Sequence, residues 1–231
     1  MKLSDGFFQA VCDYRYLLEH DYPQKPMLKM VGDRYALPSH ERVMLYRGLA
    51  KKQQVRERQQ KLLQDIPAHA EVTLDGFNVC RTVGSYLNGN PVFVGMDGYL
   101  RDVSELHRKK LNWEVLERAV ELILRFLVEK EIVFARFYFD TPISHSGKMC
   151  EMIRHNMQAM KLAGEAETVF SPDHELIAAE KGFICTADSN IIENAKVKVF
   201  DLAHQLLLKK FSVQVFSFRE YLANKKYLEK S

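Results

Sequence analysis

The sequence has no apolar run that approaches the ~18 residues of a membrane-spanning helix, and its start, Met1–Gly6, is polar. We therefore expect neither a transmembrane segment nor a signal peptide. Cysteine is sparse: Cys12, Cys80, Cys150 and Cys185 form no CxxC pair, which argues against a zinc ribbon. Two of them fall in or beside predicted strands, so we expect buried free thiols and a reduced, cytoplasmic protein.

Glycine-rich nucleotide motifs are also missing. No GxGxxG follows the first predicted strand, and GxxxxGK[ST] does not occur. These absences argue against a dinucleotide-dependent oxidoreductase and against a Walker A phosphate site. Neither sign of charge dominates the 231 residues, whose net charge is +3. The basic excess lies in residues 1–65, which carry 12 Lys and Arg against 8 Asp and Glu.

The first quarter of the chain has the pattern of a helical segment. Apolar residues recur at helical spacing in 4–20, and a second helix is predicted over 39–64, with a loop through Pro26 and Gly32 between them. Pro67 marks the boundary. We therefore predict a helical N-terminal segment, 1–66, followed by a larger domain, 67–231.

The second part alternates between strand and helix patterns. Strands are predicted over 71–75, 133–139, 168–170, 183–186, 197–200 and 213–217. Helices are predicted over 113–130, 147–162, 174–180, 189–194 and 202–210. This alternation predicts an α/β fold with a doubly wound, mostly parallel sheet.

One connection, residues 76–112, is too long for a simple crossover. It contains the turn signals Asn88-Gly89 and Asp97-Gly98. We interpret its central part, 84–110, as an inserted hairpin or loop that lies over the edge of the sheet at which the strands have their carboxyl ends. Asp97, Arg101, Asp102 and His107 would then reach the crevice where the substrate binds.

Aspartates stand at or just after the ends of five predicted strands. They are Asp75, Asp140, Asp173, Asp188 and Asp201. In a parallel sheet all carboxyl ends lie along one edge, and ligands bind in the crevice there. Carboxylates gathered at this edge repel one another, and a hard divalent cation relieves the repulsion. The pattern predicts a Mg²⁺ or Mn²⁺ site formed by Asp75, Asp140 and Asp188, with Asp173 as a further ligand.

Polar residues that suit a substrate or second shell follow three of these aspartates. Asn78 follows Asp75; Ser144, Ser146 and Lys148 follow Asp140; Ser189 follows Asp188. Each motif also has a plain structural interpretation, since Asp, Asn and Ser cap turns and helices. Three such motifs on one edge favour the metal site over capping alone.

The motifs Leu-Asp75-Gly-Phe-Asn78, Phe-Asp140 and Thr-Ala-Asp188-Ser189 resemble the acidic set of the PIN/NYN-like nuclease superfamily. The resemblance covers about 70–205 and implies a PIN-like Rossmannoid fold that holds Mg²⁺ or Mn²⁺ and cleaves RNA. The whole chain also resembles an uncharacterised prokaryotic family in which a segment like residues 14–48 precedes such a domain. Many PIN nucleases carry a further acid in a following helix, for which Glu151 is the candidate here.

These observations predict a metal-dependent endoribonuclease. The expected chemistry is attack of a metal-activated water on a phosphodiester. Cations that would contact phosphates are Lys148, Arg101, Arg47, Lys51, Lys52, Arg56, Arg58 and Lys61, although 51–61 also reads as a solvated helix face.

Two other functions stay open. One is an RNA-binding or regulatory module whose PIN-like domain does not catalyse, and the other is an aspartyl phosphatase. The phosphatase is disfavoured because Phe77 stands where a second Asp is usual. The expected partner is RNA rather than a membrane, and a homodimer is an open option.

Overall fold

The computed structural model describes residues 2–103, 112–141 and 145–228, with side chains to residue 224. The chain divides into two compact units, each built from separate segments. Unit 1 comprises 1–59, 89–110 and 214–231; unit 2 comprises 60–88 and 111–213. This division differs from the predicted split after residue 66, because the insert and the C-terminal end both pack into the unit that holds the N-terminal helices.

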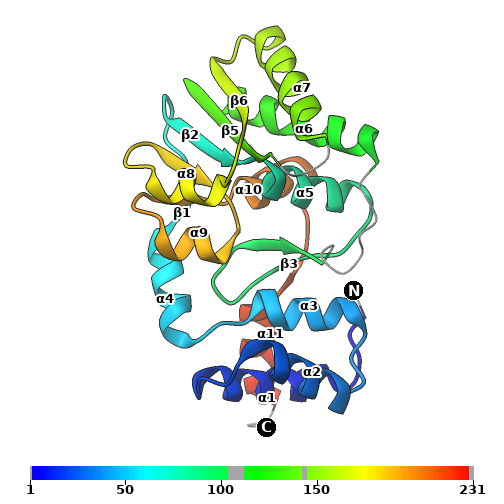
Figure 1. Cartoon of the computed structure of the whole chain (residues 1–231). Helices are drawn as coiled ribbons and strands as arrows, with labels where there is room; N and C mark the ends of the chain where they lie inside the picture. The colour runs from blue at the N-terminus through cyan, green and yellow to red at the C-terminus, as the bar shows by residue number, and fades with distance from the viewer. Residues whose placement is uncertain (1, 104–111, 142–144, 229–231) are drawn as a thin grey trace. The chain divides into compact units, whose positions relative to one another are not determined.

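Unit 2 is an α/β domain with a six-stranded parallel sheet (Figure 1). The order of its strands is β1-β8-β7-β2-β5-β6. These strands are β1 (Leu62–Leu63), β2 (Glu71–Asp75), β5 (Phe134–Asp140), β6 (Gly164–Val169), β7 (Phe183–Cys185) and β8 (Val199–Phe200). Every pairing in this sheet is parallel, which confirms the predicted fold class.

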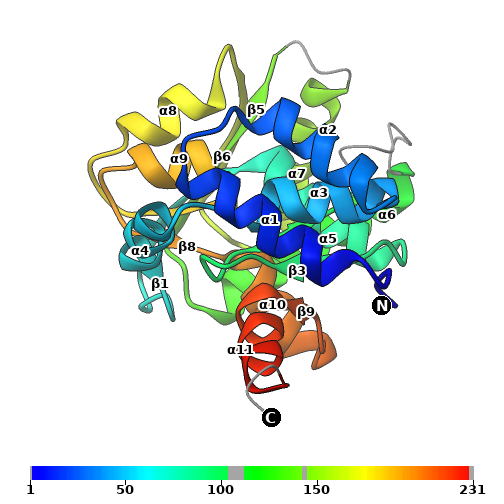
Figure 2. The ribbon, with the colours of Figure 1, turned by 90° about the horizontal axis from the view of Figure 1, so that it is seen from below.

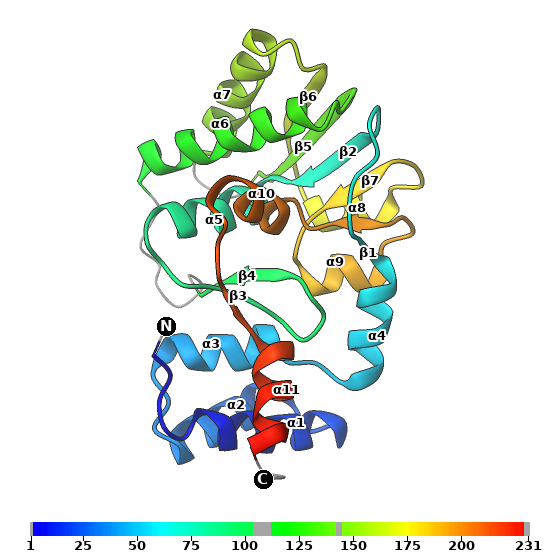
Figure 3. The same cartoon turned by 180° about the vertical axis from the view of Figure 1, so that it is seen from behind.

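Helices cover both faces of the sheet. They are α5 (Gly76–Leu87), α6 (Trp113–Glu129), α7 (Ser146–Ala159), α8 (Pro172–Ala178), α9 (Ser189–Asn194) and α10 (Leu202–Phe211). Figure 1 shows α8 and α9 in front of the sheet, and Figure 3 shows α5, α6 and α10 on the opposite face, with α7 beside α6. The stripe of apolar residues on α6 is buried, as its helical spacing predicts.

The strand order reverses at β2. From β2 the chain continues to β5 and β6 on one side, and then crosses to β7 and β8 on the other side. The helices follow this reversal: α7 joins β5 to β6 on one face, whereas α8 and α9 lead to β7 and β8 on the other. A topological switch point therefore lies between β2 and its two neighbours, β5 and β7.

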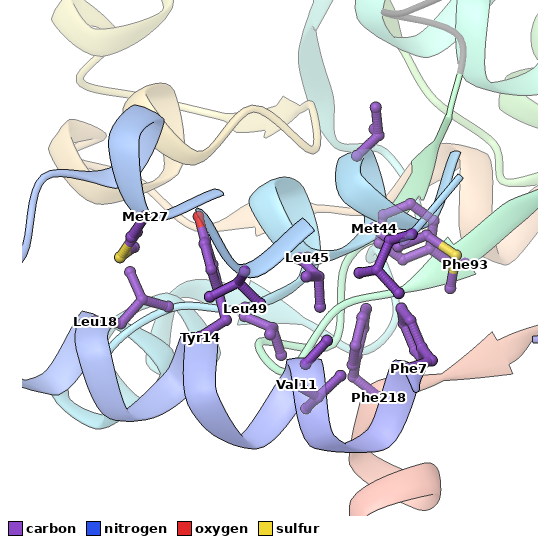
Figure 4. Close-up of a cluster of buried hydrophobic side chains, with 14 of the residues drawn as sticks. Phe7, Val11, Tyr14, Leu18, Met27, Met44, Leu45, Leu49, Phe93 and Phe218 are labelled. Atoms are coloured by element: carbon purple, nitrogen blue, oxygen red, sulfur yellow. The ribbon is translucent and has the colours of Figure 1, made fainter. Parts of the chain in front are cut away.

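Unit 1 combines helices with a small sheet of order β4-β3-β9. Its elements are α1 (Phe7–Glu19), α2 (Gln24–Arg34), α3 (Ser39–Gly48), most of α4 (Lys52–Lys61), β3 (Val92–Val94), β4 (Leu100–Asp102), β9 (Phe216–Ser217) and α11 (Phe218–Leu228). Figure 2 shows α1, α2 and α3 packed side by side. Figure 4 shows their shared core, in which Phe7, Phe93 and Phe218 meet from three distant parts of the chain.

Four sequence predictions of elements are wrong. The expected loop after the first helix is the helix α2, because Pro26 stands in its first turn, where a backbone N–H has no helical partner. The single helix predicted over 39–64 is interrupted at Leu49 and Ala50, which leave the helix and become buried. The start of the predicted insert is the helix α5. The last predicted strand, β9, pairs with β3 in the small sheet.

The structure also bears on the expectations about membrane-spanning segments and about the cysteines. No helix in the described part of the chain is long and apolar enough to cross a membrane. Cys80, Cys150 and Cys185 are buried free thiols, which confirms the prediction for the first and the last of them, and Cys12 is exposed.

Candidate functional site

Asp75 lies at the end of β2, in the middle of the sheet and at the switch point. Its Oδ1 accepts a hydrogen bond from the backbone N–H of Asn78 (3.2 Å), which caps α5. Its Oδ2 accepts one from the hydroxyl of Thr186 (3.1 Å). The residue is only 9% exposed. Burial raises the pKa of Asp75 to about 7, and the charges of Asp188 and Asp173 add to this rise, against the two hydrogen bonds.

Gly76 allows this corner to form. A Cβ on Gly76 would stand 2.4 Å from the ring of Phe139 on β5, so only glycine lets the start of α5 approach the sheet this closely. The ring of Phe77 packs edge-on against the same Phe139, with centroids 4.9 Å apart. The local sequence Asp-Gly-Phe-Asn therefore fixes the carboxylate of Asp75 between β5 and β7.

Asp140 ends β5, the strand next to β2. In the parallel register Asp75 pairs with Tyr138, so Asp140 lies two residues further along β5 and on the same face of the sheet. Its carboxyl is half-buried. Burial raises the pKa of Asp140, the charge of Asp173 raises it further, and the charge of Arg81 opposes this rise.

Asp188 stands on the other side of Asp75, just after β7. Its Oδ1 accepts hydrogen bonds from the backbone N–H groups of Asn190 (2.8 Å) and Ile191 (3.3 Å), so it caps α9. Its own N–H donates to the hydroxyl of Thr186 (3.1 Å), the same hydroxyl that donates to Asp75. Thr186 thereby links the two aspartates directly.

Two amide side chains complete the connections at this edge. Asn78 Oδ1 accepts a hydrogen bond from the backbone N–H of Ala187 (2.9 Å), which ties the start of α5 to the end of β7. Asn190 Nδ2 donates to the carboxylate of Asp173 (3.3 Å) in the first turn of α8. The predicted aspartates 75, 140, 173 and 188 therefore lie along one edge of the sheet, where Asp173 acts electrostatically on both Asp75 and Asp140, and Asp188 acts on Asp75.

The carboxylates at this edge are not arranged as the complete ligand set of a metal ion. Within the described ranges, no three His, Cys, Asp or Glu side chains are grouped closely enough to hold a metal ion as they stand. The donor chemistry nevertheless suits Mg²⁺ or Mn²⁺, because carboxylate, amide and hydroxyl oxygens surround Asp75 and hard cations prefer oxygen. The raised pKa of Asp75 shows that this environment disfavours an uncompensated negative charge.

The predicted Asp201 has a different setting. It follows β8, two strands away from β2, and is buried. Its Oδ1 accepts a hydrogen bond from the backbone N–H of His204 (3.0 Å), which caps α10. Asp201 is therefore a strand-end aspartate with a capping role away from the switch point.

Arg101 and Asp102, predicted to reach the substrate, lie in unit 1. The Arg101 guanidinium is 1% exposed and forms two hydrogen bonds with the carboxylate of Asp97, of 2.7 and 2.8 Å. Arg58 approaches the same carboxylate at 2.9 Å, and these two cations hold the pKa of Asp97 low in spite of its burial. The arrangement is a buried ion network that stabilises the insert within its own unit.

Other predicted phosphate-binding cations have internal partners as well. Arg47 donates to the backbone carbonyl of Asp102 (2.8 Å), and Lys51 pairs with Asp21. Lys61 donates to the carbonyls of Glu193 and Ala195. These contacts account for much of the basic excess of the N-terminal quarter without an RNA ligand.

The remaining predicted residues divide as follows. Ser146 is buried at the start of α7, Ser189 begins α9, and Lys148 lies over the ring of Trp113. Ser144 and His107 lie outside the described residues.

Two residues of the site were not assigned from the sequence. Thr186 bridges Asp75 and Asp188, and the exposed Arg81 acts on Asp140. Arg81 lies one helical turn after Asn78, a spacing that carries information only once α5 is known to be a helix. A cavity of about 360 Å³ lies elsewhere, at the amino ends of β2 and β5, beside Glu71, Arg136 and Gly182.

Comparisons with known proteins place the chain among relatives. Residues 65–205 match the family model described as "Domain of unknown function (DUF5616)", and residues 7–61 match the one described as "Protein of unknown function (DUF434)". The uncharacterised protein MJ0935 of Methanocaldococcus jannaschii is 31% identical over 194 residues, which cover 82% of this chain and 91% of the relative. No solved structure matches.

Proposed function

This chain belongs to the DUF5616 family, and we propose that it is a divalent-metal-dependent endoribonuclease whose site is the aspartate cluster at the switch point of the sheet. The observation that supports the proposal is that Asp75, Asp140 and Asp188 stand at the carboxyl ends of three neighbouring parallel strands, β2, β5 and β7. They come from three segments of the chain, and Asp75 and Asp140 share one face of the sheet. The resemblance of the three motifs to the PIN/NYN-like nucleases supports the same reaction and RNA as the substrate.

A cation would have a clear energetic reason to bind here. Asp75 is buried beside the charges of Asp188 and Asp173, so its ionised form is disfavoured without a counter-charge. Asp75, Asp140 and Asp188 would hold the Mg²⁺ or Mn²⁺ ion, which when bound polarises a phosphoryl oxygen and lowers the pKa of a water. Asp173, held by Asn190, would contribute from the start of α8.

The remaining residues of the site have positioning roles. The Asn78 backbone and the Thr186 hydroxyl fix both oxygens of Asp75, and Thr186 also holds the backbone of Asp188. Arg81 is exposed and is close enough to Asp140 for its charge to oppose the rise in the pKa of that carboxyl that burial causes. Arg81 is therefore well placed to neutralise a phosphate that approaches this carboxylate.

A non-catalytic RNA-binding or regulatory module is the second candidate. It is favoured by the structural roles of three of the four carboxylates, since Asp75 and Asp188 cap helices and Asp173 accepts a hydrogen bond from Asn190. A family could retain these aspartates for the fold alone. The predicted cytoplasmic location and the homodimer stay predictions.

A cleavage assay distinguishes the two candidates. Single-stranded and structured RNA are incubated with the protein and Mn²⁺ or EDTA, beside Asp75→Asn and Asp188→Asn. Asn also caps helices, so Asp188→Asn removes the charge with little effect on the start of α9. Asp201→Asn is the matched control, because it changes a strand-end aspartate that caps a helix outside the cluster.

The nuclease proposal expects Mn²⁺-dependent cleavage by the wild type and by Asp201→Asn, and a loss of at least 100-fold in both site variants, a size typical of removing a group that stabilises the transition state. RNA binding without cleavage would instead support the binding module. Release of phosphate from small phosphoesters would indicate the phosphatase. Thermal melting of each variant checks that lost activity is not lost folding.

A further inference from the structure

An aromatic and cationic cluster stands at the starts of α6 and α7. Lys148 Nζ lies 4.3 Å from the centroid of the Trp113 ring, and the His145 ring approaches the same indole with centroids 6.4 Å apart. The Trp113 indole N–H donates to the carboxylate of Glu117, one turn further along α6. Trp113 is half-buried, whereas Lys148 and His145 are exposed. The indole is thus held in place through its N–H, and one face of the ring lies against the exposed Lys148 side chain.

The cluster lies on the Asp140 side of the site. Asp140 is the last residue of β5, and α7, which carries Lys148, begins six residues later. Arg81, on α5, acts electrostatically on Asp140. Helices α5, α6 and α7 lie on the same face of the sheet, with α6 in contact with both others (Figure 3). Arg81 on α5, Trp113 on α6 and Lys148 on α7 therefore all lie on the Asp140 side of the aspartates.

Single-stranded nucleic acids are bound by this combination of groups. Bases stack on aromatic side chains, while Lys and Arg contact the backbone between them. A cation over an exposed ring is a weaker contact than a stacked base. A base can therefore replace the Lys148 ammonium on the indole, and the flexible lysine then becomes available to a phosphate.

We propose that Trp113 binds an unpaired base of the RNA substrate next to the cleaved phosphodiester, with Lys148 and Arg81 contacting the flanking phosphates. This assignment rests on the proposed function, since it places the rest of the substrate relative to the aspartates. It also specifies the substrate class. The RNA must be single-stranded at this position, because a base within a duplex is already stacked between its neighbours.

Trp113 is the one tryptophan of the sequence, so fluorescence excited at wavelengths that tyrosine does not absorb reports on it alone. The protein is titrated in EDTA with a single-stranded oligoribonucleotide, an abasic oligomer of equal length and a duplex. We expect saturable quenching by the first, and neither of the other two should quench. Binding is followed in parallel by the anisotropy of a labelled oligomer.

Variants distinguish the contribution of base stacking to the affinity for the oligomer from the contribution of phosphate contacts. Trp113→Ala should weaken binding about tenfold, as expected for the loss of one stacked base, and Trp113→Phe should retain part of the affinity. Lys148→Ala and Arg81→Ala should each weaken binding and reduce its dependence on salt by about one phosphate contact. Phe134→Ala is the matched control, because Phe134 begins β5, the strand that Asp140 ends, and therefore lies at the opposite edge of the sheet from the cluster. The affinity of this variant should equal that of the wild type.

Oligomer binding by anisotropy without quenching would overturn the assignment, and so would unchanged affinity in folded Trp113→Ala. Equal quenching by the single strand and the duplex would also overturn it. A cleavage assay on the same preparation tests the other proposal separately. Quenching without Mn²⁺-dependent cleavage contradicts the nuclease and leaves the base-binding site standing. Cleavage that is unaffected by Trp113→Ala contradicts the base-binding site alone.

Discussion

At the scale of the residue, Asp75 is the most constrained group of the proposed site. Its carboxyl is buried, has neutral hydrogen-bond donors on both oxygens and lies near two other carboxylates. Neutral donors relieve only part of the cost of burying a charge. The pKa of about 7 is the result, and it makes the ionisation of Asp75 sensitive to both pH and a bound cation.

This pKa has a consequence for the free energy of unfolding without metal. Because the folded pKa lies above the unfolded value near 3.9, protonated Asp75 favours the folded state, and this contribution is complete below pH ~4. It is lost as the pH rises to about 7. We predict that the stability of the wild type relative to Asp75→Asn falls by at most about 4 kcal/mol between pH 4 and pH 8.

Urea denaturation of both proteins in EDTA, at several pH values, measures this difference. Other titrating groups are shared by the two proteins and cancel. A difference in stability that does not change with pH would mean that Asp75 ionises normally in the folded protein. That result would remove the energetic reason for a cation at this position.

The sequence was informative about this site only in part. Strand-terminal aspartates can be recognised because a strand pattern that ends on Asp places a carboxylate at the sheet edge. Thr186 and Arg81 could not be assigned, because their roles depend on the neighbours of β2 and on α5 being a helix. Arg101 was assigned wrongly to the substrate, since sequence position alone does not reveal that Asp97 binds it in a buried pair.

At the scale of the element, the corner between β2 and α5 depends on Gly76. A methyl group there would meet the ring of Phe139 on the neighbouring strand. We predict that Gly76→Ala destabilises the protein by about 1–3 kcal/mol, the usual range for overpacking. It should also disturb the hydrogen bond between Asp75 and Asn78, so any activity should fall with the stability.

Gly147→Ala is the matched control for Gly76→Ala. Gly147 also stands near the start of a helix, and a Cβ there meets nothing within 4 Å. Alanine is the better helix former, so this variant should be as stable as the wild type or more stable, by up to about 1 kcal/mol. If denaturant titrations showed equal destabilisation of the two variants, the close approach to Phe139 would not be the reason why glycine is needed at position 76.

The elements of unit 2 after residue 112 were mostly predictable, because their amphipathic or alternating patterns are strong. Asn112 caps α6 and Asp188 caps α9, as their positions before apolar residues indicate. Weak patterns misled at α2 and α5. Proline and glycine suggested loops there, although a proline in a first turn and a buried glycine against an aromatic ring are both compatible with helix.

At the scale of the whole molecule, the chain returns at its C-terminal end to the unit in which it began. Phe218 lies in the core that the N-terminal helices form (Figure 4), and Phe216 packs against that core. The centroid of the Phe7 ring is 6.2 Å from that of Phe216 and 6.0 Å from that of Phe218. The sequence of the C-terminal end predicts only one short strand and a polar, lysine-rich tail, so it does not reveal that this end packs against the N-terminal helices. The pairing of β9 with β3 joins residues more than 100 positions apart.

We predict that Phe218→Ala destabilises the protein by about 3–5 kcal/mol, the range for removing a buried aromatic ring from a core. Phe218 is fully buried. Phe170→Ala, which removes a ring that is 89% exposed, should change the free energy of unfolding by no more than about 0.5 kcal/mol. Similar losses in both variants would show that Phe218 does not belong to a core that supports unit 1.

The gathering of carboxylates around a cation is tested most directly by Mn²⁺ binding, followed by the loss of the free-ion signal in electron paramagnetic resonance. We predict saturable binding of one or two Mn²⁺ ions by the wild type and by Asp201→Asn, tighter at pH 8 than at pH 6 because the ion competes with the proton on Asp75. Binding should be lost in Asp75→Asn and weakened in Asp140→Asn and Asp188→Asn. Titrations in which the wild type binds no Mn²⁺, or in which Asp75→Asn binds it as tightly as the wild type does, would contradict the account.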